Sequence, residues 1–378
     1  MCMPVLFDEI SKELGLNLVE IGTAWGMVSF AGIFTAFTSG MIADRFGIKK
    51  TISLVCLLMG ISGALRGLAF DFISLSVIMF LFGICTVPMS FFCHKAIGEW
   101  FTGRELGMAN GVLAMGMGGG ITLGTLLSAT VFSPLLGGWR NVLFVYGILG
   151  LVGFILWIMT KPNPYRIEVT QQAETIPFRQ SLSHVIRIKS IWFMAVAWIC
   201  TSLCRGGFSG YLPLYLRGVG WPATSADGAL SALGLASVIG VVPLSLLSDR
   251  LGRRKVVVYA AMLLIFIGIG GMSFSKGPAV WPLVIMVGLG QEALAALLIT
   301  MIMETDGVGT KYSGTALGLG TMMSLLGGTI GPPVGNALAE INPSYAFIFW
   351  AVAVLAGLVI FRFSKETGWR TRKAITTG

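Results

Sequence analysis

Charged side chains are scarce in this 378-residue sequence: they make up 11% of it, whereas hydrophobic residues make up 55%. An ordinary soluble domain carries about a quarter charged residues. A soluble chain of this length would form two or more domains, and the charges present are too few to cover their surfaces. Together with a mean hydropathy of +0.84, this shortage excludes an ordinary soluble protein. It predicts that most of the chain is dissolved in lipid.

Histidine is almost absent, with two residues, and the six cysteines stand mostly inside apolar runs without the spacing of metal ligands or disulfides. We therefore expect no metal site and no cofactor. The sequence also contains no clustered catalytic constellation and no Gly-x-x-x-x-Gly-Lys-Ser/Thr loop for a nucleotide. These absences argue against an enzyme, and they leave gradients as the source of energy for any transport.

Long apolar runs are what the sequence does contain. The hydrocarbon core of a bilayer requires about twenty apolar residues per helix. Eleven runs of roughly this length occur: Val19–Ile42, Thr51–Phe70, Ile73–Phe92, Leu106–Phe132, Val142–Met159, Ile191–Leu216, Ser231–Leu247, Val256–Phe274, Ala279–Met303, Ser313–Leu338 and Tyr345–Phe363. The predicted fold class is an all-α polytopic membrane protein with eleven transmembrane helices.

One polar stretch is much longer than the other breaks, and it contains Pro162, Pro164 and Pro177. This composition is typical of a linker between two halves. The predicted organisation is an N-terminal half-bundle (1–160), a linker (161–190), a C-terminal half-bundle (191–363) and a tail (364–378).

Lysine and arginine are distributed unevenly between alternate breaks. One set of breaks, with the linker and the tail, holds 20 of the 26 basic residues, whereas the alternate set holds only Lys12, Arg66, Arg140, Arg217 and Lys276. Because cytoplasmic loops carry an excess of Lys and Arg, we expect the first set, the linker and the C-terminus to face the cytoplasm, in a cytoplasmic membrane. The net charge of +9 then reflects topology, and its spread over short loops argues against nucleic-acid binding.

The two halves repeat several features at nearly one spacing. Two loop segments share a pattern: Gly40–Lys50 (GMIADRFGIKK) and Ser245–Lys255 (SLLSDRLGRRK). Asp44 and Asp249 are 205 residues apart, and so are Glu99 and Glu304. Three glycine pairs follow at an offset of 207: Gly111 with Gly318, Gly120 with Gly327, and Gly124 with Gly331. Several independent matches at nearly one offset indicate two parallel structural repeats.

The repeat also leaves one helix without an equivalent, because five helices in the first half correspond to six in the second. The unmatched helix is Ile191–Leu216, and its end, Tyr211–Tyr215 (YLPLY), resembles the opening Met3–Phe7 (MPVLF). We therefore expect the chain as given to start where a first helix should be ending.

These motifs resemble those of the major facilitator superfamily. The resemblance rests on the loop Gly40–Lys49, its relative Ser245–Arg254, the Gly-Gly-Trp-Arg at Gly137–Arg140 and the glycine-rich fifth and eleventh helices, and it extends through essentially the whole chain. It implies two pseudo-symmetric helix bundles with twelve helices in the full fold. It also implies a monomer in the lipid bilayer that moves a small-molecule substrate by alternating access.

The resemblance assigns the two loops a role in gating. In the family the loop acid lies against the N-terminus of a helix in the opposite half, where the helix dipole favours a negative charge. Asp44 would then face the start of the helix near Ser313, and Asp249 the start near Leu106. The expected ion pairs are Glu99 with Arg45 or Lys49, and Glu304 with Arg250 or Arg253. The full set of candidate gating residues is Gly40, Asp44, Arg45, Gly47, Lys49, Glu99, Asp249, Arg250, Gly252, Arg253 and Glu304.

Gly40 would allow two helices to approach closely, and Gly47 would allow a tight turn before the next helix. The gating contacts would have to break for the cytoplasmic side to open. The alternative is that these charges only anchor the topology.

Charges within membrane spans are expensive and usually functional. Arg205 lies mid-way along its helix, and Glu292, preceded by Gln291, lies near the middle of another. We interpret these three as candidate substrate-binding residues, since a guanidinium can hold a carboxylate by two hydrogen bonds. Glu292 could orient Arg205 or accept a coupling proton. The alternative is a purely structural ion pair. Arg66, close to the outer end of its helix, is expected to extend to the interface.

The function that these observations favour is secondary active transport of a small solute, with an organic anion as the preferred substrate class. A drug/proton antiporter is an alternative, but Met79 stands where many proton-driven members carry arginine. The fifth helix also lacks the glycine-proline signature of such antiporters, and Pro332 and Pro333 stand in the eleventh. Ile48 and Ser245 depart from the usual loop pattern as well. A non-transporting membrane sensor on the same fold is an alternative from another class, and it is expected to carry an attached soluble domain.

Overall fold

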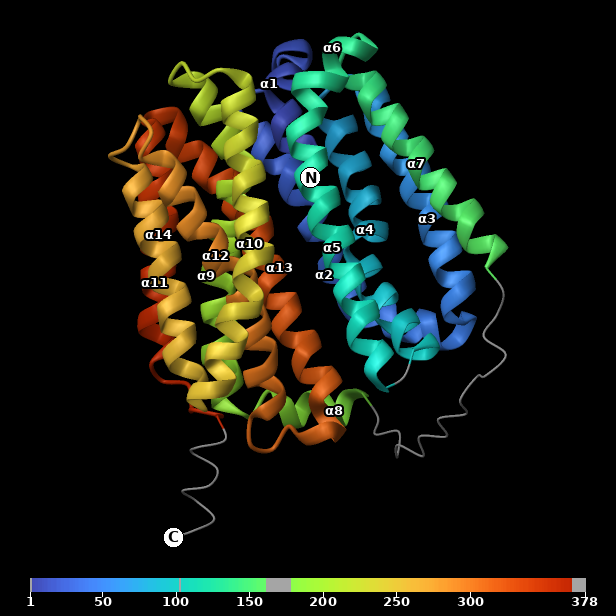
Figure 1. The fold of residues 1–378 in the computed structure, drawn as a ribbon, viewed down its shortest axis with the longest axis vertical. Helices are drawn as coiled ribbons and strands as arrows, with labels where there is room; N and C mark the ends of the chain where they lie inside the picture. Colours follow the sequence, from blue (N-terminus) through green and yellow to red (C-terminus); the bar gives the residue numbers. More distant parts are fainter. Residues whose placement is uncertain (1, 102, 161–177, 369–378) are drawn as a thin grey trace. The chain divides into compact units, whose positions relative to one another are not determined.

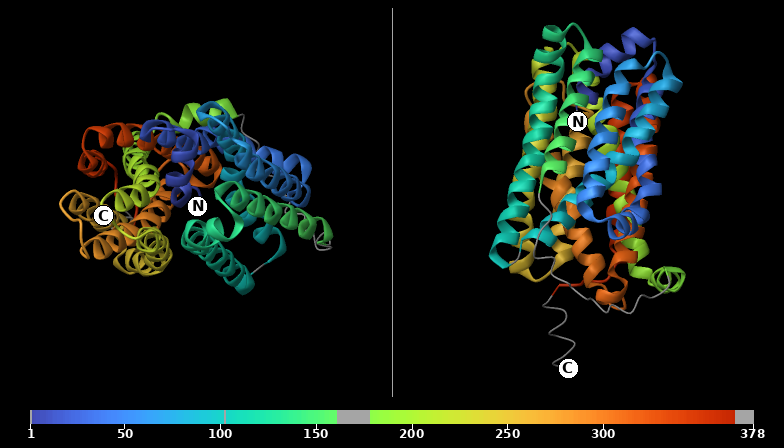
Figure 2. Two further views of the ribbon diagram at one scale, coloured as in Figure 1. Left: turned by 90° about the horizontal axis from the view of Figure 1, so that it is seen from above. Right: turned by 90° about the vertical axis from the view of Figure 1, so that its right-hand side faces the viewer.

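A computed structural model describes residues 2–101, 103–160 and 178–368, and every regular element within these ranges is a helix. The chain divides into two compact units, Met1–Gln171 (unit 1) and Gln172–Gly378 (unit 2). The division falls inside the predicted linker. In each unit the long helices run side by side as a bundle (Figures 1 and 2).

Within its described residues, unit 1 contains five long helices, two short helices and two irregular turns. Its elements are α1 (Met3–Leu14), α2 (Leu18–Phe46), α3 (Ile48–Leu65), the 3-10 turn η1 (Arg66–Leu68), α4 (Phe72–Trp100), α5 (Gly103–Leu127), the π-helical turn η2 (Ser128–Phe132), α6 (Ser133–Leu136) and α7 (Trp139–Met159).

Unit 2 contains a short helix and six long ones. They are α8 (Phe178–Val185), α9 (Lys189–Gly218), α10 (Ala223–Leu251), α11 (Arg254–Met272), α12 (Val280–Glu304), α13 (Gly309–Ile341) and α14 (Pro343–Phe361). The linker was predicted only as a polar stretch, so α8 is an element that the sequence interpretation missed.

Each of the eleven predicted apolar runs coincides with a long helix. Within the described residues, ten helices are long and apolar enough to cross a membrane. The eleventh, α13, is longer than any of them but rich in glycine, threonine and proline, which lowers its hydropathy. Some helices are longer than the apolar runs that predicted them. Helix α4 continues to Trp100, whereas its run ends at Phe92, and α10 begins at Ala223, whereas its run begins at Ser231. Polar residues extend a helix beyond the hydrocarbon core without raising its hydropathy.

Local signals explain where several helices begin and end. The Asn17 side chain accepts a hydrogen bond from the Glu20 amide at 2.8 Å, and the Glu20 carboxylate accepts one from the Asn17 amide at 2.9 Å. This reciprocal pair satisfies two amides that the first turn of α2 leaves free. Gly47, with φ +80°, separates α2 from α3, and Gly252, with φ +62°, ends α10. These positive φ values confirm the tight turn predicted at Gly47 and explain the glycines at both positions.

Glycine also lets the helices of a unit approach one another. A Cβ on Gly331 of α13 would lie 2.0 Å from the Leu203 carbonyl oxygen of α9, and one on Gly327 would lie 2.3 Å from that of Ile199. The equivalent positions of the first repeat differ, because a Cβ on Gly120 of α5 would meet nothing within 4 Å. At Gly120 and its equivalent Gly327, the repeat therefore corresponds to close helix packing only in unit 2.

Helix α1 is tied to the rest of unit 1 by its two glutamates. Ser133 donates to the Glu9 carboxylate at 2.5 Å, and Glu13 accepts from the Trp139 indole at 2.6 Å and from Arg140 Nε at 2.7 Å. The hydrogen bond from Arg140 holds the pKa of the Glu13 carboxyl below its ordinary value. Charged and polar partners at one end of the bundle therefore fix α1 in place.

Arg66 lies elsewhere than the sequence predicts. Its side chain does not extend to the interface, because it is only 4% exposed. Its Nε donates to the Gly63 carbonyl at 3.2 Å, and its guanidinium carbon lies 3.9 Å from the centre of the Phe82 ring. The aromatic face attracts the cation and offsets part of the cost of burying it.

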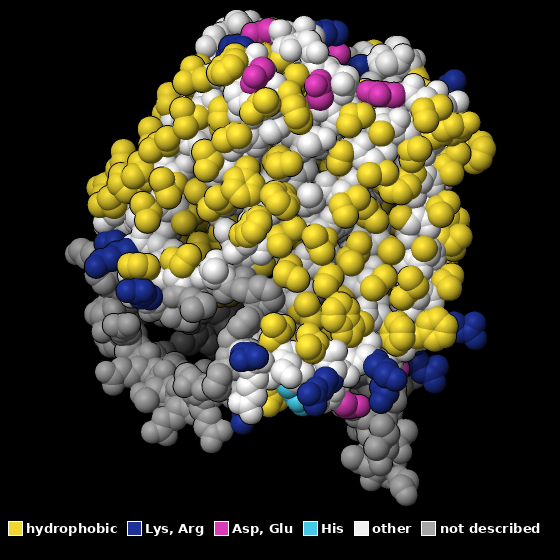
Figure 3. Space-filling model, turned by 180° about the vertical axis from the view of Figure 1, so that it is seen from behind, with side chains coloured by type: hydrophobic (Ala, Val, Ile, Leu, Met, Phe, Trp, Pro, Cys, Tyr) yellow, Lys and Arg dark blue, Asp and Glu magenta, His cyan; other side chains and the backbone are white. Residues whose placement is uncertain are grey.

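The exterior of the bundles is apolar. Figure 3 shows hydrophobic side chains over the middle of the visible face, with Lys and Arg concentrated near its lower edge. In α7, for example, Ile148, Leu149, Ile155 and Leu156 are all more than half exposed. Exposed aliphatic surface on this scale is stable only in contact with lipid.

Candidate functional site

A charged pair joins two helices inside unit 2. Arg205 lies in α9 and Glu292 in α12, and Arg205 Nη2 lies 2.5 Å from Glu292 Oε1. Both side chains remain partly accessible, with 43% and 36% of their surface exposed. A lone charge facing lipid at mid-span costs about 3 kcal/mol or more, so the pairing explains how both residues are tolerated. The accessible surface leaves the guanidinium able to meet a ligand.

Other polar groups lie on α9, α12 and the neighbouring helix α13. Gln291 is 8% exposed, and within the described residues its amide nitrogen has no hydrogen-bond partner. Ser202 of α9 and Ser324 of α13 share a hydrogen bond of 2.7 Å between their hydroxyl oxygens. The serines were not predicted, because single serines are common in membrane helices and carry no distinguishing pattern.

The backbone of α9 around Arg205 is held by its neighbours. A Cβ on Gly206 would lie 3.1 Å from the Gly328 carbonyl oxygen of α13, and one on Gly207 would lie 2.3 Å from the Trp350 ring of α14. Side chains larger than hydrogen would push α9 away from both helices. The two glycines after Arg205 therefore fix its position relative to α13 and α14.

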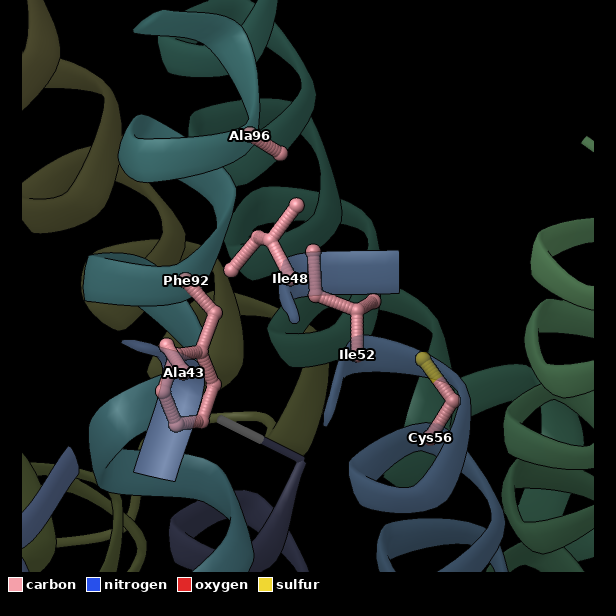
Figure 4. Close-up of a cluster of buried hydrophobic side chains, with 6 residues drawn as sticks. All are labelled: Ala43, Ile48, Ile52, Cys56, Phe92 and Ala96. Atoms are coloured by element: carbon pink, nitrogen blue, oxygen red, sulfur yellow. The ribbon is translucent and has the colours of Figure 1, made fainter. Parts of the chain in front are cut away.

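The first loop motif is anchored by a buried apolar cluster. Ala43 and Ile48, on either side of the turn, belong to this cluster with residues of α3 and α4: Ile52, Cys56, Phe92 and Ala96 (Figure 4). Ile48 departs from the usual family pattern, and its 5% exposure gives the reason: the side chain packs in the cluster, where a basic residue would be buried.

The other candidate residues of the first motif lie around this cluster. Arg45 is exposed and lies over the Phe46 ring at 5.6 Å, Lys49 lies in the first turn of α3, and Glu99 lies in the last turn of α4. Gly40 and Asp44 belong to α2, but their surroundings lie outside the described part of the chain. The gating contact expected of Asp44 therefore stays a prediction.

The second loop motif forms a network around a residue that the sequence did not single out. Arg254 contacts the Asp249 carboxylate, and its Nη2 and Nε donate to the Glu304 carboxylate at 3.0 and 3.2 Å. The predicted partners of Glu304 were Arg250 and Arg253. Arg250 lies in the last turn of α10 and Arg253 is the N-cap of α11. The structure shows Glu304 paired with Arg254, the first residue of α11.

The segment after α14 completes this network. The Glu366 carboxylate accepts hydrogen bonds from the backbone amides of Arg254 at 2.8 Å, Lys255 at 3.2 Å and Gly368 at 3.1 Å. The Thr367 hydroxyl donates to Glu304 at 3.1 Å. A carboxylate at the N-terminus of α11 satisfies amides that the helix leaves free and complements its dipole. The tail therefore holds the second motif, a role that its charge pattern alone did not reveal.

Comparison with known proteins assigns this architecture to a family. The family model described as Major Facilitator Superfamily matches residues 1–310 and, in a second overlapping match, residues 229–376. The chain belongs to the major facilitator superfamily. Its all-helical fold, with two units of membrane-spanning helices, is that of this superfamily.

Two similar curated proteins are named as transporters. A probable sulfoacetate transporter of Cupriavidus necator is 24% identical, over 92% of this chain and 85% of its own length. A hexuronate transporter of Bacillus subtilis is also 24% identical, over 94% of this chain and 88% of its own length. Among solved structures, a bacterial homologue of the human lysosomal transporter Spinster has a TM-score of 0.73 at 16% identity, covering 96% of this chain and 91% of that one. This chain is therefore a multi-pass membrane transport protein, and not an enzyme.

Proposed function

We propose that this member of the superfamily is a secondary active transporter that moves a small organic anion, with Arg205 as the residue that binds the anionic group. The observation that carries the proposal is a guanidinium in the middle of α9 that keeps 43% of its side chain exposed although it is paired with Glu292. A planar guanidinium can hold a carboxylate or sulfonate through two parallel hydrogen bonds. In a site shielded from water such bonds are strong.

The names of the relatives support the same class of substrate. Sulfoacetate and hexuronates both carry an anionic group on a small polar molecule, and the matches to these two transporters cover nearly all of this chain. In our proposal Glu292 orients Arg205 in the empty site and accepts the coupling proton. Gln291 is proposed to contact polar groups of the substrate through an amide that has no partner among the described residues.

Transport by alternating access requires contacts that open and close the site. We propose that the two loop motifs supply them, with the loops, the linker and the tail on the cytoplasmic side. The basis is the recurrence of Asp44 and Asp249 at equivalent positions. In the second motif Asp249 and Glu304 also meet at Arg254, so movement of α10 or α12 would disturb this contact.

Replacing Asp44 or Asp249 with asparagine is expected to leave membrane insertion intact and to lower transport about tenfold, a typical size for coupling between two states. Accessibility labelling of single cysteines should show a changed balance of inward-open and outward-open states. Asp306→Asn is the matched control, because Asp306 is an exposed acid at the same end of unit 2 outside both motifs. Wild-type labelling and transport in both motif variants would refute the gating role.

The substrate class is tested by an uptake screen in proteoliposomes with and without a proton gradient. We expect accumulation of one or more small carboxylates or sulfonates, driven or modulated by the gradient, and none of neutral sugars. Export of cationic drugs in exchange for protons would show a drug/proton antiporter instead. If no compound exchanges in either direction although the reconstituted protein is folded, the non-transporting sensor gains support.

A further inference from the structure

A second polar site lies in unit 2 between α8 and the start of α13. Helix α8 packs against α13, and it runs across the ends of the long helices instead of along them (Figures 1 and 2). A hollow of about 500 Å³ lies beside it. The residues that line this hollow are Arg179, Gln180, Ser183, His184, Arg187 and Tyr312.

The spacing of the lining residues places them on one side of α8. Arg179 and Ser183 are four residues apart and lie on one face of α8, and Arg187 lies in the turn just beyond the end of the helix. Ser181 and Val185, on the other side, are 6% and 0% exposed. Helix α8 therefore buries one side in unit 2 and presents the side with Arg179 to the hollow, which Arg187 lines from the following turn.

The frame of the hollow is fixed by contacts that do not involve the arginines. The His184 ring stacks on Tyr312 with 4.2 Å between ring centres, and His184 Nε2 lies 2.8 Å from the Gly307 carbonyl oxygen. The Trp192 indole donates to the Ile186 carbonyl at 2.8 Å, just beyond the end of α8. A frame held in this way loses little conformational freedom when a ligand binds.

The chemistry of the lining favours a phosphate group. It offers two guanidinium groups, an imidazole, an amide and two hydroxyls, and the described residues contribute no carboxylate to it. Guanidinium groups bind phosphate through paired, charge-assisted hydrogen bonds.

We propose that this hollow binds the phosphate of an anionic phospholipid headgroup. A lipid is favoured over a soluble phosphate because the adjoining residues suit a membrane surface: Trp192 and Ile186 are 37% and 44% exposed, and tryptophan concentrates at the bilayer interface. Basic residues just outside the cytoplasmic ends of spans attract the anionic lipids of that leaflet. The inference uses the proposed cytoplasmic position of the linker but not the proposed substrate. Bound lipid would hold α8 against the bilayer.

Native mass spectrometry of the delipidated full chain in detergent tests the proposal, with phosphatidylglycerol and phosphatidylcholine of identical acyl chains as probes. We expect phosphatidylglycerol to be retained preferentially. Arg179→Gln/Arg187→Gln should weaken its retention about tenfold or more, since each basic residue at a membrane surface contributes appreciably. Ser183→Asp should have a similar effect, because it places a carboxylate between the two arginines. Lys12→Gln/Lys276→Gln is the control, as it removes two exposed cations elsewhere.

Thermal unfolding of each variant would show that the fold is retained, as expected for exposed arginines. Equal retention of the two lipids by the wild type would overturn the proposal, and so would equal loss in the test and control variants. Inorganic phosphate is the third probe. If it displaces phosphatidylglycerol at concentrations as low as those at which the lipid binds, the ligand is a soluble phosphate and the assignment to a lipid is wrong.

Discussion

Arg205→Ala is expected to reduce uptake of the anionic substrate about a hundredfold, because it removes a charge-assisted, two-pronged contact of about 3 kcal/mol. It also leaves the Glu292 carboxylate without the partner that lies at 2.5 Å. Arg205→Lys keeps the charge but loses the planar fork, so we expect an intermediate loss of about tenfold. Binding of the substrate identified by the uptake screen, measured by counterflow, separates the two variants.

Glu292→Gln distinguishes binding from coupling. If Glu292 carries the coupling proton, the variant should still exchange substrate by counterflow but should no longer accumulate it against a gradient. Lys276→Ala is the matched control, because Lys276 is an exposed cation of unit 2 outside the spans. Unchanged affinity and unchanged pH dependence in all three site variants would show that the pair is structural, and the anion assignment would lose its main support.

The second large effect is expected at a buried ion pair between α9 and α10. Arg217 Nη2 lies 2.6 Å from Asp227 Oδ1, and the Asp227 side chain is fully buried while that of Arg217 is 14% exposed. Removing one partner of such a pair leaves a buried charge and typically costs about 3–5 kcal/mol. We therefore expect Asp227→Ala to lower the Tm of the purified protein by about 6–20 °C.

Two further variants show whether this loss comes from the unpaired charge. Arg217→Met/Asp227→Leu removes both charges and is expected to recover most of the stability, since an apolar pair of similar volume is often as stable as a buried ion pair. Asp8→Ala disrupts the exposed pair of Asp8 with Lys12, whose side chain is 73% exposed, and should change the Tm by less than about 2 °C. If Asp227→Ala behaves like Asp8→Ala, the pair at Arg217 contributes nothing measurable.

Some features of the functional site could be read from the sequence, and others could not. Arg205 and Glu292 stood out because charges are rare within membrane spans, and the structure places them in contact. Their contact depends on the rotation of α9 and α12 about their axes, and the packing of Gly206 and Gly207 against α13 and α14 sets that of α9. Glu304 was recognised as a paired acid, but its partner Arg254 was not. The contact with Arg254 depends on where α11 begins and on the tail residue Glu366.

What the sequence by itself determined is the number and order of the long helices, the internal repeat and the family. A bilayer imposes a minimum length of apolar chain on each span, so these properties are local along the chain. Only the tertiary structure decided which polar groups meet. In it Arg66 is buried against Phe82, although the sequence predicted that this side chain extends to the interface. Helix α8 forms within the stretch that the sequence predicted as a linker, and the tail lies against the start of α11. Each of these outcomes depends on contacts between segments far apart in sequence, and neither composition nor periodicity carries that information.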